Sequence, residues 1–189
     1  MSTLEDSIRI ENVVSSATLN QKIDLNAIVK GNPSVEYRPE KFPGLVFRLK
    51  RPKTAILIFS TGKMVCTGAK SEKESKKAVQ KVVKELKKSG IIILGEPDIQ
   101  VVNIVASANL LGRIELEDCA YTLGRTMYEP EQFPGLIYRM DDFKVVILLF
   151  ASGKLVCTGA TKEEDVYKAV NKLHETLTEK NLIYYDEEL

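Results

Sequence analysis

Pairs of polar and apolar side chains recur along the chain at a constant spacing of 91 residues. The polar pairs are two amides, Asn12 and Asn103, and two threonines, Thr67 and Thr158. The apolar members of the two sets are Val14, Val65, Phe42 and Phe59, and then Val105, Val156, Phe133 and Phe150. Amide and hydroxyl groups donate hydrogen bonds, whereas valine and phenylalanine offer apolar contact. The sequence therefore contains the same mixed set twice.

The minor groove of A·T-rich DNA is a surface that such a set would fit. The groove presents hydrogen-bond acceptors above an apolar floor, so Asn and Thr can donate to it, and Val would reject the projecting amino group of guanine. Phenylalanines at matched positions could insert between base steps, and Arg48 and Arg139 add a positive charge beside the phenylalanine turns. Core packing is the other role for a single phenylalanine, but symmetric pairs beside Pro-Gly turns favour the exposed role.

Motifs for catalysis and for metal binding are weak by comparison. Gly62-Lys63 and Gly153-Lys154 lack the upstream glycine and the following Ser or Thr of a P-loop. The only histidine, His174, is matched by Val83 in the other copy, which indicates a boundary residue. The cysteines form no C-x-x-C pair, and we expect all three to be buried: Cys66, Cys119 and Cys157. The sequence predicts that the protein is not an enzyme and needs no metal or cofactor.

Longer stretches return at the same spacing. Residues 39–48 and 62–69 are nearly repeated as residues 130–139 and 153–160. A repeat of this length is a duplicated half-domain rather than a solenoid unit. The sequence therefore predicts one repeat over residues 1–95 and a second over residues 96–189, which ends in a short acidic tail that includes Glu187 and Glu188.

Each copy is predicted to form a strand, a short helical segment, a meander of strands and a long amphipathic helix. The long helices are expected to be capped at Ser71 and Thr161. Within the meanders, Ala55–Phe59 and Val146–Phe150 are apolar on both faces, although the helices suffice to cover only one face. The other face is expected to meet something else, and a second layer or a dimer partner is the alternative to a ligand.

The net charge of +1 conceals two halves of opposite charge. Residues 1–95 hold 18 Lys and Arg against 9 Asp and Glu, whereas residues 96–189 hold 9 against 17. Different partners on the two halves are expected, with solvated faces as the alternative. The first residues lack the blocks of a signal peptide, and the apolar runs are strand-sized. A cytoplasmic location is therefore expected, or a nuclear one if the source were eukaryotic.

The repeated motifs resemble those of the TATA-box-binding proteins, in their archaeal form, over essentially the whole chain. The resemblance is carried by residues 133–139 and 63–70, and by Asn12-Val-Val and Asn103-Ile-Val. It implies an α+β fold: a pseudo-two-fold saddle with one curved antiparallel sheet of ten strands and four helices on its convex face. It also implies a general transcription initiation factor that binds the minor groove of the TATA box.

The resemblance further implies a role for each site residue. The residues that would intercalate, kinking and unwinding the DNA, are Phe42, Phe59, Phe133 and Phe150. The donors to groove acceptors would be Asn12, Asn103, Thr67 and Thr158. The groove floor would be lined by Val14, Leu57, Val65, Val105, Leu148 and Val156. Phosphates would be contacted by Arg48, Lys63, Arg139 and Lys154. Transcription factor B would contact Glu129 and Glu131, and RNA polymerase would follow it.

A scaffold or ligand-binding protein remains the alternative at this stage, because an apolar face can also take a protein partner. A preference for A·T-rich duplex would separate the two hypotheses. The resemblance implies in addition that a homodimer can form through the same face when DNA is absent.

Overall fold

The computed structural model describes residues 2–186, which fall into two compact units. The unit formed by Asn12–Val102 is called the first half, and the unit formed by Met1–Glu11 with Asn103–Leu189 is called the second half. Glu187 and Glu188 of the predicted acidic tail lie outside the described residues. No described helix is long and apolar enough to cross a membrane.

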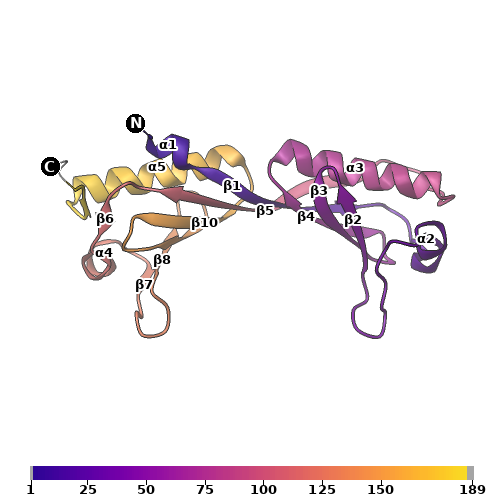
Figure 1. Ribbon diagram of the computed structural model, residues 1–189, viewed down its shortest axis with the longest axis horizontal. Coiled ribbons are helices and arrows are strands. Elements are labelled where there is room, and N and C mark those ends of the chain that lie inside the picture. The colour runs from indigo at the N-terminus through magenta and orange to yellow at the C-terminus, as the bar shows by residue number, and fades with distance from the viewer. Residues whose placement is uncertain (1, 187–189) are drawn as a thin grey trace. The chain divides into compact units, whose positions relative to one another are not determined.

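The first half contains a four-stranded antiparallel sheet in the order β2-β3-β4-β1. Its strands are β1 (Arg9–Thr18, which begins in the second half), β2 (Leu45–Lys50), β3 (Lys53–Ile58) and β4 (Lys63–Ala69). Its helices are α2 (Leu25–Gly31) and α3 (Glu72–Lys88). The long helix α3 lies against one face of the strands (Figure 1). This is the predicted order of elements.

The second half repeats this arrangement with strands in the order β5-β10-β9-β8-β7. These strands are β5 (Asp98–Asn109), β7 (Thr126–Met127), β8 (Leu136–Met140), β9 (Val145–Leu149) and β10 (Lys154–Ala160). Its helices are α1 (Leu4–Ser7), α4 (Leu116–Thr122) and α5 (Glu163–Glu179). A separate pair, β6 (Arg113–Ile114) and β11 (Ile183–Tyr184), ties the segment after α5 to the segment before α4.

The strand and helix counts differ slightly from the expected ten and four. Strand β7 pairs with β8 at two positions, whereas its counterpart in the first half is reduced to a single bridge between Glu36 and Val46. The two halves therefore contribute four and five strands to the main sheet order. Helices α2 to α5 are the four expected ones. The short α1 is additional, and a capping box between Thr3 and Asp6 caps its N-terminus.

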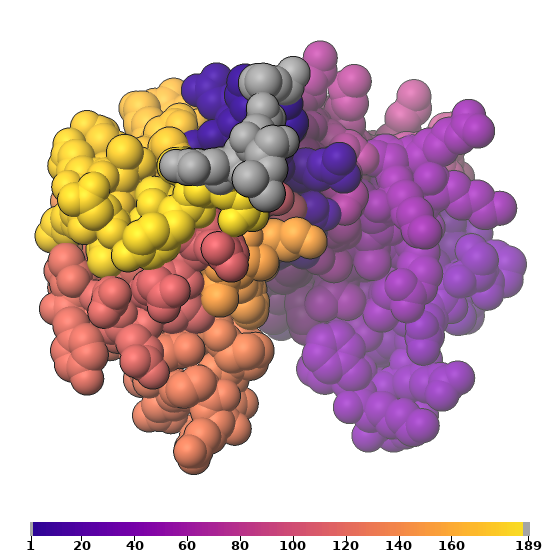
Figure 2. Space-filling model, turned by 60° about the vertical axis from the view of Figure 1, so that its left-hand side comes forward, coloured from indigo at the N-terminus to yellow at the C-terminus, as the bar shows by residue number. Residues whose placement is uncertain are grey.

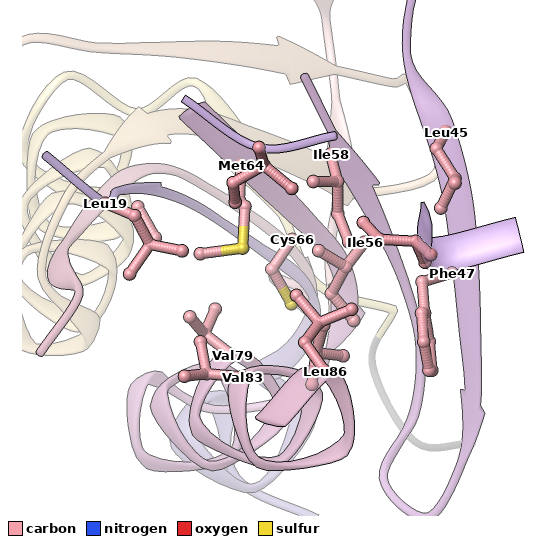
Figure 3. Close-up of a cluster of buried hydrophobic side chains, with 14 of the residues drawn as sticks. Leu19, Leu45, Phe47, Ile56, Ile58, Met64, Cys66, Val79, Val83 and Leu86 are labelled. Carbon is pink, nitrogen blue, oxygen red and sulfur yellow. The ribbon is translucent and has the colours of Figure 1, made fainter. Parts of the chain in front are cut away.

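One face of each half-sheet is buried against its long helix and forms the core. In the first half, Ile56, Ile58, Met64 and Cys66 point from the strands toward Val79 and Leu86 of α3 (Figure 3). All of these side chains are fully buried. Apolar residues at helical spacing on α3 and period-two alternation in the strands therefore meet at one interface.

The two long helices begin differently. The Ser71 hydroxyl accepts a hydrogen bond from the Glu74 N–H at 3.0 Å, as predicted for α3. The predicted cap at Thr161 is wrong, because Lys162 occupies the N-cap position of α5 and its side chain makes no capping bond. Instead, three acidic residues in the first turn of α5 stabilise this end of the helix, because their negative charges lie near the positive end of the helix dipole.

The three cysteines are buried and unpaired, as predicted. Burial raises the pKa of Cys66, and it raises the pKa of Cys157 to about 12. The pKa of Cys119 rises to about 11 through burial and the nearby carboxylates of Asp118 and Glu115. These thiols are protonated at neutral pH and belong to the core.

Candidate nucleic-acid interface

The face of each half-sheet that turns away from its long helix is called the open face. Its side chains alternate along the strands with the fully buried ones and are only partly buried. In the first half, Val46, Leu57 and Val65 lie side by side across β2, β3 and β4, and Ser16 continues the row on β1. The matching row in the second half is Ile137, Leu148, Val156 and Ser107. Both open faces are thus apolar at their centre.

A hydrogen-bonded cluster of an amide, a threonine and a glycine stands at the same place on each open face. The Gly68 N–H donates to Asn12 Oδ1 at 2.7 Å, and Asn12 Nδ2 donates to Thr67 Oγ1 at 3.1 Å. The second half repeats these contacts between Gly159 and Asn103 at 2.7 Å, and between Asn103 and Thr158 at 3.3 Å. The predicted amides and threonines are therefore brought together in pairs.

The contact with glycine fixes which way each amide points. An amide oxygen occupied by a backbone N–H leaves the NH₂ group as the polar end available to a ligand, and that group has two protons. One proton of Asn12 Nδ2 is directed to Thr67, and the other remains for an acceptor on the open face. The cluster consequently presents a hydrogen-bond donor, which is the group that minor-groove acceptors require.

A β-bulge creates this glycine contact. The pairing of β1 with β4 shifts between Val13 and Ser15, and the pairing of β10 with β5 shifts at the matching place between Thr158 and Ala160. The bulge glycines have φ of +99° at Gly68 and +103° at Gly159. Side chains strongly disfavour this backbone conformation, so glycine is required where the strand must turn its N–H toward the asparagine.

The four phenylalanines form two edge-to-face pairs. The ring centroids of Phe42 and Phe59 are 5.9 Å apart at 70°, and those of Phe133 and Phe150 are 5.9 Å apart at 69°. Phe42 is 43% exposed and Phe133 is 37% exposed, although large aromatic side chains gain most from burial. In each pair, one ring belongs to the residue that directly follows a strand, Phe59 or Phe150. It packs against the ring of the loop residue, Phe42 or Phe133.

Glycine is also needed beneath each phenylalanine pair. A Cβ at Gly44 would lie 2.7 Å from Phe42 Cε1 and 3.0 Å from Phe59 Cε1. A Cβ at Gly135 would lie 2.8 Å from Phe133 Cε1 and 3.0 Å from Phe150 Cε1. The repeated Pro-Gly turn therefore leaves room for both rings to rest on the backbone.

The open-face side of the strands carries exposed cations, which include the four that are predicted to contact phosphates. Arg48 and Lys63 alternate with buried residues along their strands, so they lie on the same side as the open face of the first half. Arg139 and Lys154 do the same in the second half. Arg48 also contacts Glu36 at 3.6 Å, in a pair whose partners are both more than half exposed. Such surface pairs contribute little stability, so Arg48 can exchange this partner for another anion.

The predicted acidic contact residues lie on a projecting loop. Glu129 and Glu131 are exposed and flank Pro130 between β7 and β8. Figure 2 shows this loop projecting from the body of the second half. Both carboxylates are therefore accessible, and they lie in the chain directly before Phe133.

Sequence reasoning missed part of the open face. Val46 and Ile137 belong to the central rows, and Ser16 and Ser107 end them. The period-two alternation of β2 and β8 could have identified the first pair, because their buried neighbours Leu45 and Leu136 are strongly apolar. The serines required the register between strands, which the sequence does not specify.

Known proteins match this chain over most of its length. The family model described as transcription factor TFIID (or TATA-binding protein, TBP) matches residues 7–89 and 98–180. A TATA-box-binding protein of Pyrodictium occultum is 58% identical over 168 residues, which are 89% of this chain and 84% of that protein. Another, from Sulfurisphaera tokodaii, is 53% identical over 184 residues, covering 96% and 93%.

A solved structure shows the same fold. Methanococcus jannaschii TBP superimposes with a TM-score of 0.82 at 49% sequence identity, and the match covers 92% of this chain and 99% of that one. The relatives named are archaeal, and both repeats are matched by the family model. The chain therefore belongs to the TATA-binding protein family, a family of DNA-binding general transcription initiation factors that are not enzymes.

Proposed function

We propose that this protein binds the minor groove of the TATA box through the open faces of both halves. The observation that carries the proposal is the repeated orientation of Asn12 and Asn103, whose oxygens are held by glycine N–H groups at 2.7 Å. Each amide then offers a donor to adenine N3 or thymine O2. The apolar rows centred on Leu57 and Leu148 lie against the groove floor and exclude the guanine amino group.

The phenylalanine pairs kink and unwind the bound duplex in this proposal. Phe42 and Phe133 are the more exposed rings, and each is supported at its edge by Phe59 or Phe150. Inserting a supported ring between base steps costs stacking energy of a few kcal/mol, which is offset by burying the ring and the apolar row. Kinking of this kind is a known property of the TATA-binding family, and the proposal extends it to this chain.

Partners are proposed for the second half. The exposed carboxylates of Glu129 and Glu131 would receive transcription factor B, and RNA polymerase would then be recruited by that factor. Without DNA, the two apolar rows are available for a homodimer contact between copies of this chain. A nucleoid-associated, cytoplasmic location is proposed because the ligand is chromosomal DNA.

The wedge role is tested by a Phe133→Ala variant on a duplex that carries a TATA-like box. Energy transfer between dyes at the duplex ends reports the bend. We expect a clearly smaller end-to-end shortening for Phe133→Ala than for the parent when the duplex is saturated with either protein. Phe143→Ala is the matched control, since Phe143 lies in the turn between β8 and β9. If Phe133→Ala bends the duplex as strongly as the parent, the wedge assignment is wrong.

A further inference from the structure

The outward surface of α3 carries a row of lysines that the open face does not use. The row consists of Lys73, Lys77, Lys81 and Lys84, all exposed, and is called the lysine stripe. At 100° per residue these four positions fall within one narrow stripe of the helix, away from the buried side of Val79, Val82 and Leu86. Figure 1 shows α3 lying along one face of the first-half sheet, and this face is called the helical side.

The second half has no such stripe, although its long helix occupies the matching place. Positions matched at a spacing of 91 residues are Glu164, Lys168, Lys172 and Glu175, so the charges there cancel. Lys168 contacts Glu164 at 2.8 Å, and Lys172 contacts Asp142 at 3.2 Å. Within the described residues, Lys77 and Lys81 make no ion pair.

A neighbouring turn adds to the positive charge of the stripe. Lys81 Nζ donates a hydrogen bond to the carbonyl oxygen of Arg51 at 2.7 Å, which holds this cation against the turn between β2 and β3. The residue matched to Arg51 is Asp142, the partner that neutralises Lys172 in the second half. Two elements of the first half therefore concentrate positive charge where the second half balances it.

The chemistry of the stripe favours the phosphate backbone over a protein partner. Every large apolar residue of α3 faces the core, so the stripe offers no aromatic or aliphatic anchor of the kind that dominates protein interfaces. Lysines make sequence-independent contacts to phosphate. From Lys73 to Lys84 the helix rises about 16 Å, which is the length of about five base pairs.

We propose that the lysine stripe, together with Arg51, is a second DNA-binding surface that takes duplex DNA without regard to sequence. It lies on the helical side of the first-half sheet, whereas Leu57 and Asn12 lie on the open side. A duplex held by its minor groove on the open side is kinked toward its major groove, away from the protein, and so cannot reach the helical side. The stripe therefore binds a separate segment of duplex. This site would let a molecule engaged on one duplex capture another.

The test compares matched double variants on a labelled G·C-rich duplex that has no box. Lys77→Gln with Lys81→Gln removes the stripe, and Lys168→Gln with Lys172→Gln makes the same change at the matched positions of α5. Glutamine favours helix nearly as well as lysine, so both helices should persist. We expect the first variant alone to weaken binding severalfold, with a salt slope shallower by about 1.8, or about 0.9 for each phosphate that is no longer neutralised.

A second arm separates the stripe from the open face. The parent is first bound to one equivalent of unlabelled box duplex, which occupies the open faces without leaving excess duplex to compete for the stripe. The labelled G·C-rich duplex is then added, and we expect its capture to persist. Equal effects of the two double variants, or loss of capture once one equivalent of box duplex occupies the open faces, would overturn the proposal. Binding of poly-glutamate but not of the G·C-rich duplex would assign the stripe to an acidic protein and would also overturn it.

Discussion

At the scale of single residues, the site depends on which polar atom each side chain leaves free. Asn12 and Asn103 could serve as donors or acceptors, and their type alone does not decide between these roles. The N–H groups of Gly68 and Gly159 decide it by occupying the amide oxygens. The sequence indicated the paired amides and threonines, but not the glycine contact that orients them, because a β-bulge depends on pairing between distant strands.

An Asn12→Asp variant tests the donor role. A carboxylate of the same shape still accepts from Gly68, and Thr67 can donate to it, so the free energy of unfolding should change by less than about 1 kcal/mol. The outward donor is replaced by a negative charge that faces groove acceptors, so affinity for a TATA-like duplex should fall at least about tenfold. Fluorescence anisotropy and denaturant unfolding measure the two quantities. An unchanged affinity would contradict the assigned orientation.

The buried thiols make the stability of the folded state fall as the pH rises above the ordinary pKa of cysteine. Because burial raises the pKa of Cys157 from 9.0 to about 12, the folded state keeps a proton that the unfolded state loses above about pH 9. Stability is therefore lost between pH 9 and 12, by up to about 1.4 kcal/mol per pH unit for this thiol. Native protein at pH 8 should react with a thiol reagent far more slowly than protein in denaturant. Rapid labelling of all three cysteines in the native state would contradict their burial.

At the scale of elements, glycines shape the strand ends and turns that present the site. Period-two alternation allowed the strands and their two apolar faces to be predicted, and helical spacing did the same for α3 and α5. The cap of α5 at Lys162 and the reduction of the tenth strand to one bridge at Glu36 were not predicted. Both depend on a few hydrogen bonds at element ends, where local sequence signals are weak.

A Gly135→Ala variant tests the support beneath one phenylalanine pair. The added Cβ would lie 2.8 Å from Phe133 and 3.0 Å from Phe150, so at least one ring must move. We expect reduced DNA bending with a modest loss of stability, because Phe133 is already partly exposed. Gly124→Ala is a suitable control, since nothing lies within 4 Å of its added Cβ. Equal bending by the two variants would show that the ring position is not set by this turn.

At the scale of the whole molecule, the two halves share a fold but differ in charge. The repeat at 91 residues allowed the duplicated architecture to be predicted, and the family model matches each copy separately. Composition also revealed the excess of cations in residues 1–95. It could not reveal that Lys172 is neutralised by Asp142 while Lys81 contacts the Arg51 carbonyl, because those contacts join a helix to a turn.

The salt dependence of box binding follows from the charges on the open faces. Six strand cations alternate with the buried side chains and so lie on the open-face side: Arg48, Lys50, Lys53, Lys63, Arg139 and Lys154. At most six phosphate contacts are therefore expected. The slope of log K against log salt on a duplex no longer than the box should then be no steeper than about −5.4. A titration of affinity between low and moderate salt measures it. A slope near about −8 would mean that cations outside the open faces contribute to box binding.

Both proposals about the open faces require that they bind and bend A·T-rich duplex. Energy transfer between dyes at the two ends of a short duplex tests it directly, with one duplex that holds a TATA-like box and one that holds a G·C-rich scramble. We expect a large end-to-end shortening on the box duplex at saturation and none on the scramble. No shortening on either duplex, or equal shortening on both, would contradict minor-groove recognition by these faces.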